Sequence, residues 1–193
     1  MRIYTKKGDD GTTGLLFGGR VPKQSARIEL NGAVDEAQAA LGVARAETER
    51  GCELDQWLVG IERDLYVLMA EVATAPANRH KLVAGTSLVT SGMVEALEAR
   101  IDELMERFEM PSEFIVPGQN RLSAALDVAR TAVRRAERLA AGGLDGSEPV
   151  PPPPDGSQVL PYLNRLSDLV WAMARWQEGD DHVPARGTRK EGR

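Results

Sequence analysis

The sequence contains few of the side chains that form disulfides, hold metals or transfer protons. It has one cysteine, Cys52, and two histidines, and aromatic residues make up only 5% of it. One cysteine excludes an intrachain disulfide and is typical of proteins from a reducing compartment. His80 has no other histidine or cysteine near it in the sequence, so no metal ligand is predicted.

Long apolar runs and an excess of positive charge are also absent. Residues 1–10 contain no apolar core of a secretory signal, and no run approaches the length of a membrane-spanning helix. The net charge is -5 and the isoelectric point is about 5.2, whereas nucleic-acid-binding domains are typically basic. These absences predict a cytoplasmic protein without membrane or nucleic-acid partners.

The chain is long enough for one well-packed domain, which we expect over residues 1–178. Its 193 residues are 42% hydrophobic, which is sufficient for one core. Apolar residues recur at helical spacing in five segments, at about residues 31–49, 53–73, 87–108, 119–141 and 158–176. Without a convincing sheet pattern, this predicts an all-α fold, a five-helix bundle over residues 31–178. An extended Gly/Thr-rich N-terminal loop precedes it over residues 1–30, and a polar tail, expected to be disordered, follows over residues 179–193.

Local signals place the ends of two of these helices. Asn31 is a good N-cap for the first helix, and acidic residues follow it near the positive end of the helix dipole. The fourth helix is predicted to start near Gln119 or Asn120. It is followed by GGLDGSEPVPPPPDG, residues 142–156, whose prolines favour a stiff polyproline spacer.

The N-terminal loop contains KKGDDGTTGLLFGGRVPK at residues 6–23. Closely spaced glycines let backbone N–H groups turn toward an anion, because no Cβ blocks the approach. The loop also offers hydroxyl donors and positive charges, from Thr5, Thr12, Thr13, Lys6, Lys7 and Lys23. It lacks the Gly-Lys-Ser/Thr of a Walker A loop. Anion binding and a flexible N-terminal turn are both open interpretations.

The fourth helix carries an arginine strip. Arg130, Arg134, Glu137 and Arg138 share one narrow strip beside an apolar face, and Arg135 lies next to it. Arginines on successive turns repel one another, and Glu137 alone cannot balance them. A polyphosphate is a suitable partner, because the guanidinium fork matches phosphate oxygens. The alternative is a solvated basic face.

Four further residues stand out, two of them with two interpretations each. Phe114 is either a hydrophobic staple at the start of the fourth helix or a residue with a functional role. Asp35 is either a first-turn acid or the fixed partner of an arginine. Asn164 lies at a buried edge and requires a hydrogen-bond partner. Trp57 is expected in the core or in an interface rather than in chemistry.

Four segments, taken together, resemble one family. They are YTKKGDDGTTGLLFGG, N(G)AVDE, FIVPG followed by ARTAVRRAER, and YLNRLSDLVWAMAR. In this order they resemble the PduO-type ATP:cob(I)alamin adenosyltransferases, over most of residues 2–176. The resemblance implies a five-helix bundle assembled as a homotrimer with active sites between subunits. It also implies ATP, Mg²⁺ and a cobalamin substrate.

The resemblance also implies residue roles. Arg134 would stabilise the triphosphate, Arg130 would pair with Asp35 of the adjacent subunit, and Phe114 would crowd the lower face of the corrin. The other nucleotide-site residues it implies are Thr5, Lys6, Lys7, Gly8, Thr12, Thr13, Lys23, Arg135, Glu137, Arg138 and Asn164. Two departures from the family pattern stand out: Asp10 replaces a frequent lysine, and Gln119-Asn120 replaces a frequent second glycine.

The implied activity is transfer of the 5′-deoxyadenosyl group of ATP to cob(I)alamin, giving adenosylcobalamin and inorganic triphosphate. A flavin-dependent reductase and an adenosylcobalamin-dependent mutase are the partners it suggests. The main alternative is a non-catalytic ATP- or cobalamin-binding chaperone of a cobalamin-dependent enzyme. An RNA-binding arginine helix is a third reading, and the acidic total charge disfavours it.

Overall fold

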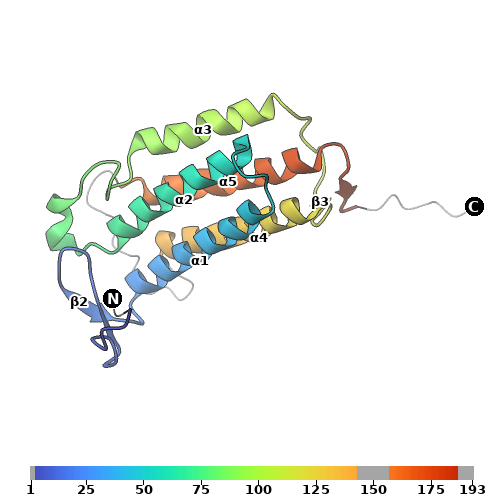
Figure 1. The fold of residues 1–193 in the computed structure, drawn as a ribbon. Coiled ribbons are helices and arrows are strands. Elements are labelled where there is room, and N and C mark those ends of the chain that lie inside the picture. Colours follow the sequence, from blue (N-terminus) through green and yellow to red (C-terminus); the bar gives the residue numbers. More distant parts are fainter. Residues whose placement is uncertain (1–2, 143–156, 187–193) are drawn as a thin grey trace, which may run out of the picture.

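The computed structural model describes residues 3–142 and 157–186. Within them it contains helices α1 (Ala26–Ala46), α2 (Glu53–Val72), α3 (Ser91–Met105), α4 (Arg121–Ala141) and α5 (Val159–Glu178), and the 3-10 helix η1 (Pro76–Lys81) (Figure 1). Four short strands accompany them: β1 (Thr12–Gly14), β2 (Arg20–Pro22), β3 (Ile115–Val116) and β4 (Val183–Pro184). The predicted all-α five-helix bundle is confirmed. The predicted polyproline spacer lies almost entirely outside the described residues.

The core is shared by all five α-helices. α4 packs against both α1 and α5, α2 packs against α1, and α3 packs against α5. Among the side chains with no exposed surface are Leu41, Leu58, Leu104, Leu126 and Met173, one from each helix. Burying a side chain of this size contributes about 1.5–3 kcal/mol, so the apolar spacing fixes which face of each helix turns inward.

Helix α1 starts earlier than predicted. It begins at Ala26, after the extended N-cap residue Ser25, and not at Asn31. Leu30 is buried and continues the apolar face of Ala33, Val34 and Ala37 one turn upstream. Burial of that turn outweighs the intrinsic preference of asparagine for an N-cap, so Asn31 lies inside the helix.

Helix α4 starts where it was predicted. Asn120 is its N-cap: its Oδ1 accepts from the backbone N–H of Ser123 at 2.8 Å, and Ser123 Oγ accepts from the N–H of Asn120 at 3.3 Å. This reciprocal pair is a capping box. The Asn120 amide also donates to the carbonyl of Gln177 at 2.9 Å, which links the start of α4 to the end of α5.

Two small antiparallel pairs of strands accompany the helices and were not predicted. β1 pairs with β2 inside the N-terminal loop, and β3 pairs with β4. The expectation of a disordered tail is therefore wrong for Val183–Pro184; residues 187–193 lie outside the described residues. In the described ranges, none of the helices has the length and apolar character needed to cross a membrane.

Candidate functional site

The N-terminal loop is a hairpin held together by Arg20. The Arg20 guanidinium donates to Thr12 Oγ1 at 2.6 and 2.9 Å and to the carbonyl of Lys7. Thr12 in turn donates to Asp10 Oδ1, from its N–H at 2.9 Å and its hydroxyl at 2.8 Å. These hydrogen bonds, the backbone one first, lower the pKa of Asp10 below its ordinary value, and Arg20 adds to the effect. Asp10 is thus a structural anion of the loop.

Close packing in the hairpin explains why residue 8 is a glycine. A Cβ on Gly8 would lie 3.1 Å from the Thr12 carbonyl oxygen and 3.2 Å from Lys23 Nζ. The backbone oxygen cannot give way as a flexible side chain would. The small residue therefore lets Lys23, predicted at the nucleotide site, approach Gly8.

The hairpin is anchored to the bundle by its tip. The N–H of Leu16 donates to the Ala73 carbonyl at 2.9 Å, just after α2. The Asn78 amide in η1 donates to the carbonyl of Phe17 at 3.3 Å, and Phe17 adopts a φ of 63°. A backbone in the left-handed region is costly for a phenylalanine, so these contacts fix the tip against local strain.

The arginine strip on α4 is confirmed as a helical face, and its members have different surroundings. Arg134 and Arg138 are exposed, and Arg138 donates to the carbonyl of Arg134 at 3.2 Å. Arg135 is half-buried and forms an ion pair with Glu36 of α1. Glu137 is half-buried and accepts from Asn164 Nδ2 at 2.8 Å. The structure therefore brings Glu137 and Asn164 together, and leaves the two exposed guanidiniums facing solvent.

Arg130 is held by a buried ionic cluster. Its Nε donates to Asp127 Oδ1 at 3.2 Å, and Arg175 Nη2 donates to Asp127 Oδ2 at 2.6 Å. Glu178 completes the cluster, 3.0 Å from Arg175 Nε. Arg175 is only 3% exposed, so its charge is compensated by two carboxylates rather than by water. Within this chain Arg130 pairs with Asp127, and Asp35 lies exposed on α1.

Phe114 is not a staple. Its side chain is 92% exposed, so it does not pack on the first turn of α4. Its carbonyl accepts from the N–H of Ala185 at 2.6 Å, which extends the β3–β4 pairing by one residue. An apolar ring held in water beside an ordered backbone favours a role in contact with a ligand or a partner. Trp57, by contrast, is 8% exposed and belongs to the core.

The predicted site residues gather at two places. The hairpin lies at the end of the bundle where α1 begins, and the antiparallel α4 runs toward that end (Figure 1). Among residues 3–142 and 157–186, no hydrogen bond or ion pair joins residues 3–23 to α4. Phe114 lies at the opposite end of α4, whose 21 residues span about 30 Å.

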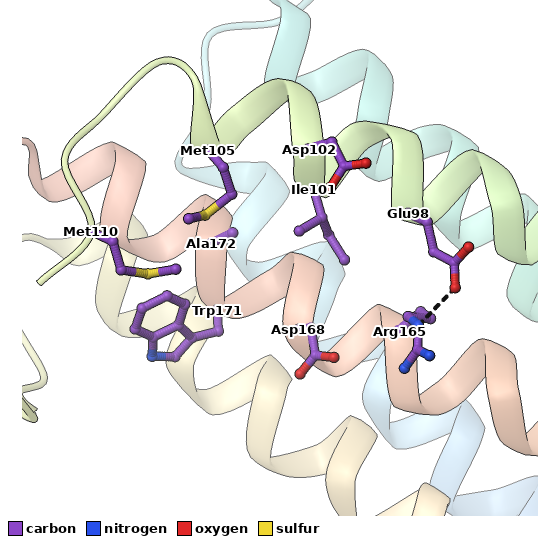
Figure 2. Close-up of a pocket in the computed structure, with 9 residues that line it drawn as sticks. All are labelled: Glu98, Ile101, Asp102, Met105, Met110, Arg165, Asp168, Trp171 and Ala172. Carbon is purple, nitrogen blue, oxygen red and sulfur yellow. Dashed lines mark hydrogen bonds and ion pairs between the residues drawn. The ribbon is translucent and has the colours of Figure 1, made fainter. Parts of the chain in front are cut away.

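A cavity of about 420 Å³ lies between α3 and α5 (Figure 2). Apolar side chains form part of its wall, and three acidic residues and Arg165 also line it. The lining residues are Glu98, Ile101, Asp102, Met105, Met110, Arg165, Asp168, Trp171 and Ala172. No predicted site residue is among them, but Arg165 donates to Asn164 and so connects the cavity to the nucleotide-site prediction.

Side chains that can bind metals do not cluster in the part of the chain that the structure describes. There, no three His, Cys, Asp or Glu side chains come together in a way that could hold a metal ion. A magnesium ion usually needs only one or two carboxylates when substrate phosphates supply the other oxygens. Glu137 on the arginine strip offers one such carboxylate, which fits an ion that arrives with a polyphosphate.

Sequence reasoning did not identify Arg20, Asp127 and Arg165. The hairpin signal was present, because TTG and RVP flank a turn rich in glycine, and the resulting pairing places Arg20 opposite Gly14, on the same face as Thr12. Asp127 and Arg165 each lie on a strongly periodic helix. The Asp127–Arg130 pair has i, i+3 spacing on α4, which a local pattern could have revealed, but Arg175 and Glu98 come from other helices, so no local pattern reveals those two contacts.

Comparisons with known proteins give a consistent result. A family model described as cobalamin adenosyltransferase matches residues 3–177. A corrinoid adenosyltransferase of Citrobacter freundii is 40% identical over 185 residues, which are 95% of this chain and 99% of that protein. A corrinoid adenosyltransferase of Bacillus subtilis strain 168 is 38% identical over 179 residues, 91% of this chain and 86% of that protein.

Solved structures agree with the family model. A variant of a PduO-type ATP:corrinoid adenosyltransferase from Lactobacillus reuteri, complexed with cobalamin and ATP, matches with a TM-score of 0.79 and 29% identity. The match covers 96% of this chain and 100% of that chain. A second variant of that enzyme, complexed with ATP, matches with a TM-score of 0.78, also at 29% identity. That match covers 95% of this chain and 100% of that chain. This chain therefore belongs to the cobalamin adenosyltransferase family.

Proposed function

We propose that this chain is an ATP:cob(I)alamin adenosyltransferase, which transfers the 5′-deoxyadenosyl group of ATP to cob(I)alamin and releases inorganic triphosphate. The observation that carries the proposal is the exposed pair Arg134 and Arg138 on α4, beside the Glu137–Asn164 hydrogen bond. Family membership supplies the reaction.

Catalysis of this reaction requires stabilisation of charge in the transition state rather than proton transfer. The cobalt of cob(I)alamin attacks C5′ of ATP with its own electron pair, the C5′–O bond breaks, and the triphosphate leaves with that bond's electrons. Because the nucleophile carries no proton, no general base is required. The leaving group gains negative charge in the transition state, and preorganised guanidiniums stabilise it there. Arg134 and Arg138 serve this role, with Lys23 and the loop residues Thr5 through Gly8 and Thr13, while Thr12 shapes the loop.

The hairpin fits phosphate binding in a specific way. Its Thr12 hydroxyl is already engaged by Asp10 and Arg20, so Thr12 contributes mainly by shaping the loop. Lys23 and the N–H groups near Gly8 remain the donors for the phosphates. Mg²⁺ would be held by the triphosphate oxygens, with Glu137 as the acidic side chain on the strip, and would neutralise part of the phosphate charge.

Each active site is formed between neighbouring chains of a homotrimer. The hairpin and β3, which Phe114 directly precedes, lie at opposite ends of the bundle (Figure 1), and α4 between them spans about 30 Å, so a single chain holds these two parts far apart. Head-to-tail assembly around a threefold axis brings the hairpin of one chain to the arginine strip of the next. Asp35 of one chain then meets Arg130 of its neighbour. Phe114 excludes water and the axial base from the lower face of the corrin.

The test is turnover with ATP and chemically reduced cobalamin, followed by the absorbance of adenosylcobalamin and by release of triphosphate. We expect product in stoichiometric amounts with triphosphate. Arg134→Ala should lower kcat/KM by a factor that corresponds to a loss of about 2–4 kcal/mol of transition-state stabilisation, as loss of one such donor does elsewhere. A folded parent chain that binds ATP and cobalamin without forming adenosylcobalamin would instead be the non-catalytic chaperone.

The cellular setting follows from the reaction. A reductase, such as a flavin-dependent one, must supply the electron that gives cob(I)alamin, and a mutase that uses adenosylcobalamin must receive the product. Both partners and a cytoplasmic location remain predictions.

A further inference from the structure

A continuous polar chain crosses the bundle from α4 to α3 through two consecutive residues of α5. Asn164 Nδ2 donates to Glu137 Oε1 on α4 at 2.8 Å, and Arg165 Nη1 donates to Asn164 Oδ1. Arg165 Nε donates to Glu98 Oε1 on α3 at 2.8 Å (Figure 2). The guanidinium therefore bridges the wall of the α3–α5 cavity and the amide of Asn164.

This arrangement determines which way the Asn164 amide faces. A guanidinium can only donate hydrogen bonds, and an ionised carboxylate can only accept them. Arg165 must therefore meet the amide oxygen, and Glu137 must meet the amide nitrogen. One N–H and one oxygen lone pair of Asn164 remain for a ligand. Without Arg165, the oxygen would lose its charged donor, and the amide could rotate about its terminal bond.

We propose that Arg165 is a positioning residue of the nucleotide site, which fixes the Asn164 amide for ATP and is itself fixed by Glu98. The inference rests on the proposed function, because that function places Asn164 at ATP. It assigns a role to α3, which carries none of the predicted site residues. The chemistry recognised is the hydrogen-bonding edge of a nucleotide by an oriented amide.

The surface exposure of the ion pair separates this role from a structural one. The side chains of Arg165 and Glu98 are 41% and 45% exposed, and ion pairs of this kind contribute little to stability. Removing the guanidinium should thus leave the melting temperature nearly unchanged. Its effect should appear in ATP affinity, and only when Asn164 is present to be oriented.

The experiment is a double-mutant cycle on the dissociation constant for ATP, measured by calorimetry on the assembled protein. Arg165→Met should weaken ATP binding about tenfold in the parent, the scale of one charge-assisted hydrogen bond. In an Asn164→Ala background, the same change should have less than about a twofold effect. Arg45→Met is the matched control, because Arg45 is 37% exposed, pairs with Asp55 and lies outside the predicted site.

Glu98→Ala provides a second route to the same conclusion. It removes the anchor of Arg165 and should weaken ATP binding in the parent but have no further effect in Arg165→Met. Equal effects of Arg165→Met in both backgrounds, or an affinity within twofold of the parent, would overturn the positioning role. If the parent chain itself fails to bind ATP, the proposed function fails, and that result is distinct from a silent Arg165→Met.

Discussion

The role of a single side chain such as Phe114 depends on its surroundings in the fold. From the residues alone the default interpretation was a hydrophobic staple, because an apolar residue just before a helix is typical of one, and the wedge role was implied only by the family resemblance. The 92% exposure of the ring excludes the staple within this chain. The position of Arg130 on the arginine strip was predicted, but its ion pair with Asp127 was not. Whether two charged side chains on a helix meet depends on how far each reaches around the helix.

Replacement of Phe114 by alanine tests the wedge directly. The change should leave ATP affinity close to that of the parent, because Phe114 precedes α4 and Arg134 lies about 20 Å along that helix from its first residue. Turnover should fall, because water or the axial base can then reach cobalt. Magnetic resonance of Co(II)-cobalamin bound with ATP gives the readout: the four-coordinate species should diminish. An undiminished four-coordinate signal in the alanine variant would assign Phe114 to another role.

At the scale of elements, helix identity was predictable, and so were the bounds of α2, α4 and α5 to within about two residues, but the ends of α1 and α3 were not. Apolar spacing identified all five α-helices, because burial of one face dominates their energetics. The start of α1 was misplaced, since the burial of Leu30 overrode the capping preference of Asn31. The strands of two or three residues are too short for period-two alternation to register. They arise from loop contacts, such as the pairing of Thr12 with Pro22.

A hydrogen bond between α2 and the start of α5 gives a pH-dependent prediction. Tyr162 is fully buried, and its hydroxyl donates to Asp64 Oδ2 at 3.0 Å. Burial raises the pKa of Asp64 above its ordinary 3.8, and the Tyr162 hydrogen bond offsets part of the rise. The folded state then holds more protons above pH 3.8 than the unfolded state, so this group's contribution to stability falls as pH rises.

Asp64→Asn retains an acceptor for Tyr162 and removes the ionisation. Its melting temperature should exceed that of the parent at pH 7, and the difference should shrink as the pH is lowered toward 4. Asp55→Asn is the matched control of opposite sign. The Gly51 N–H and then Arg45 lower the pKa of Asp55, so its stabilisation is present above pH 3.8 and lost below it. An Asp64→Asn difference that does not vary with pH would reject this account.

At the scale of the whole molecule, the question is whether one chain completes its own site. Complementation between two inactive variants answers it: one changed at Thr13 and Lys23 on the hairpin, the other at Arg134. If the two halves of a site come from different chains, co-refolding equal amounts should restore about a quarter of the sites by random assembly. If each chain completes its own site, every site retains a defect. A mixture that stays inactive, with mixed assemblies demonstrated by mass, would rule out the shared site.

The pairing of β3 with β4 has a consequence for affinity. The backbone that carries Phe114 is ordered by the Val183–Pro184 strand and by the hydrogen bond from Ala185 before any ligand arrives. A molecule that contacts the ring therefore meets a preorganised segment, and the loss of chain entropy has already occurred during folding. Loosening this pairing, even far from the ring, would shift that entropy cost onto the binding step.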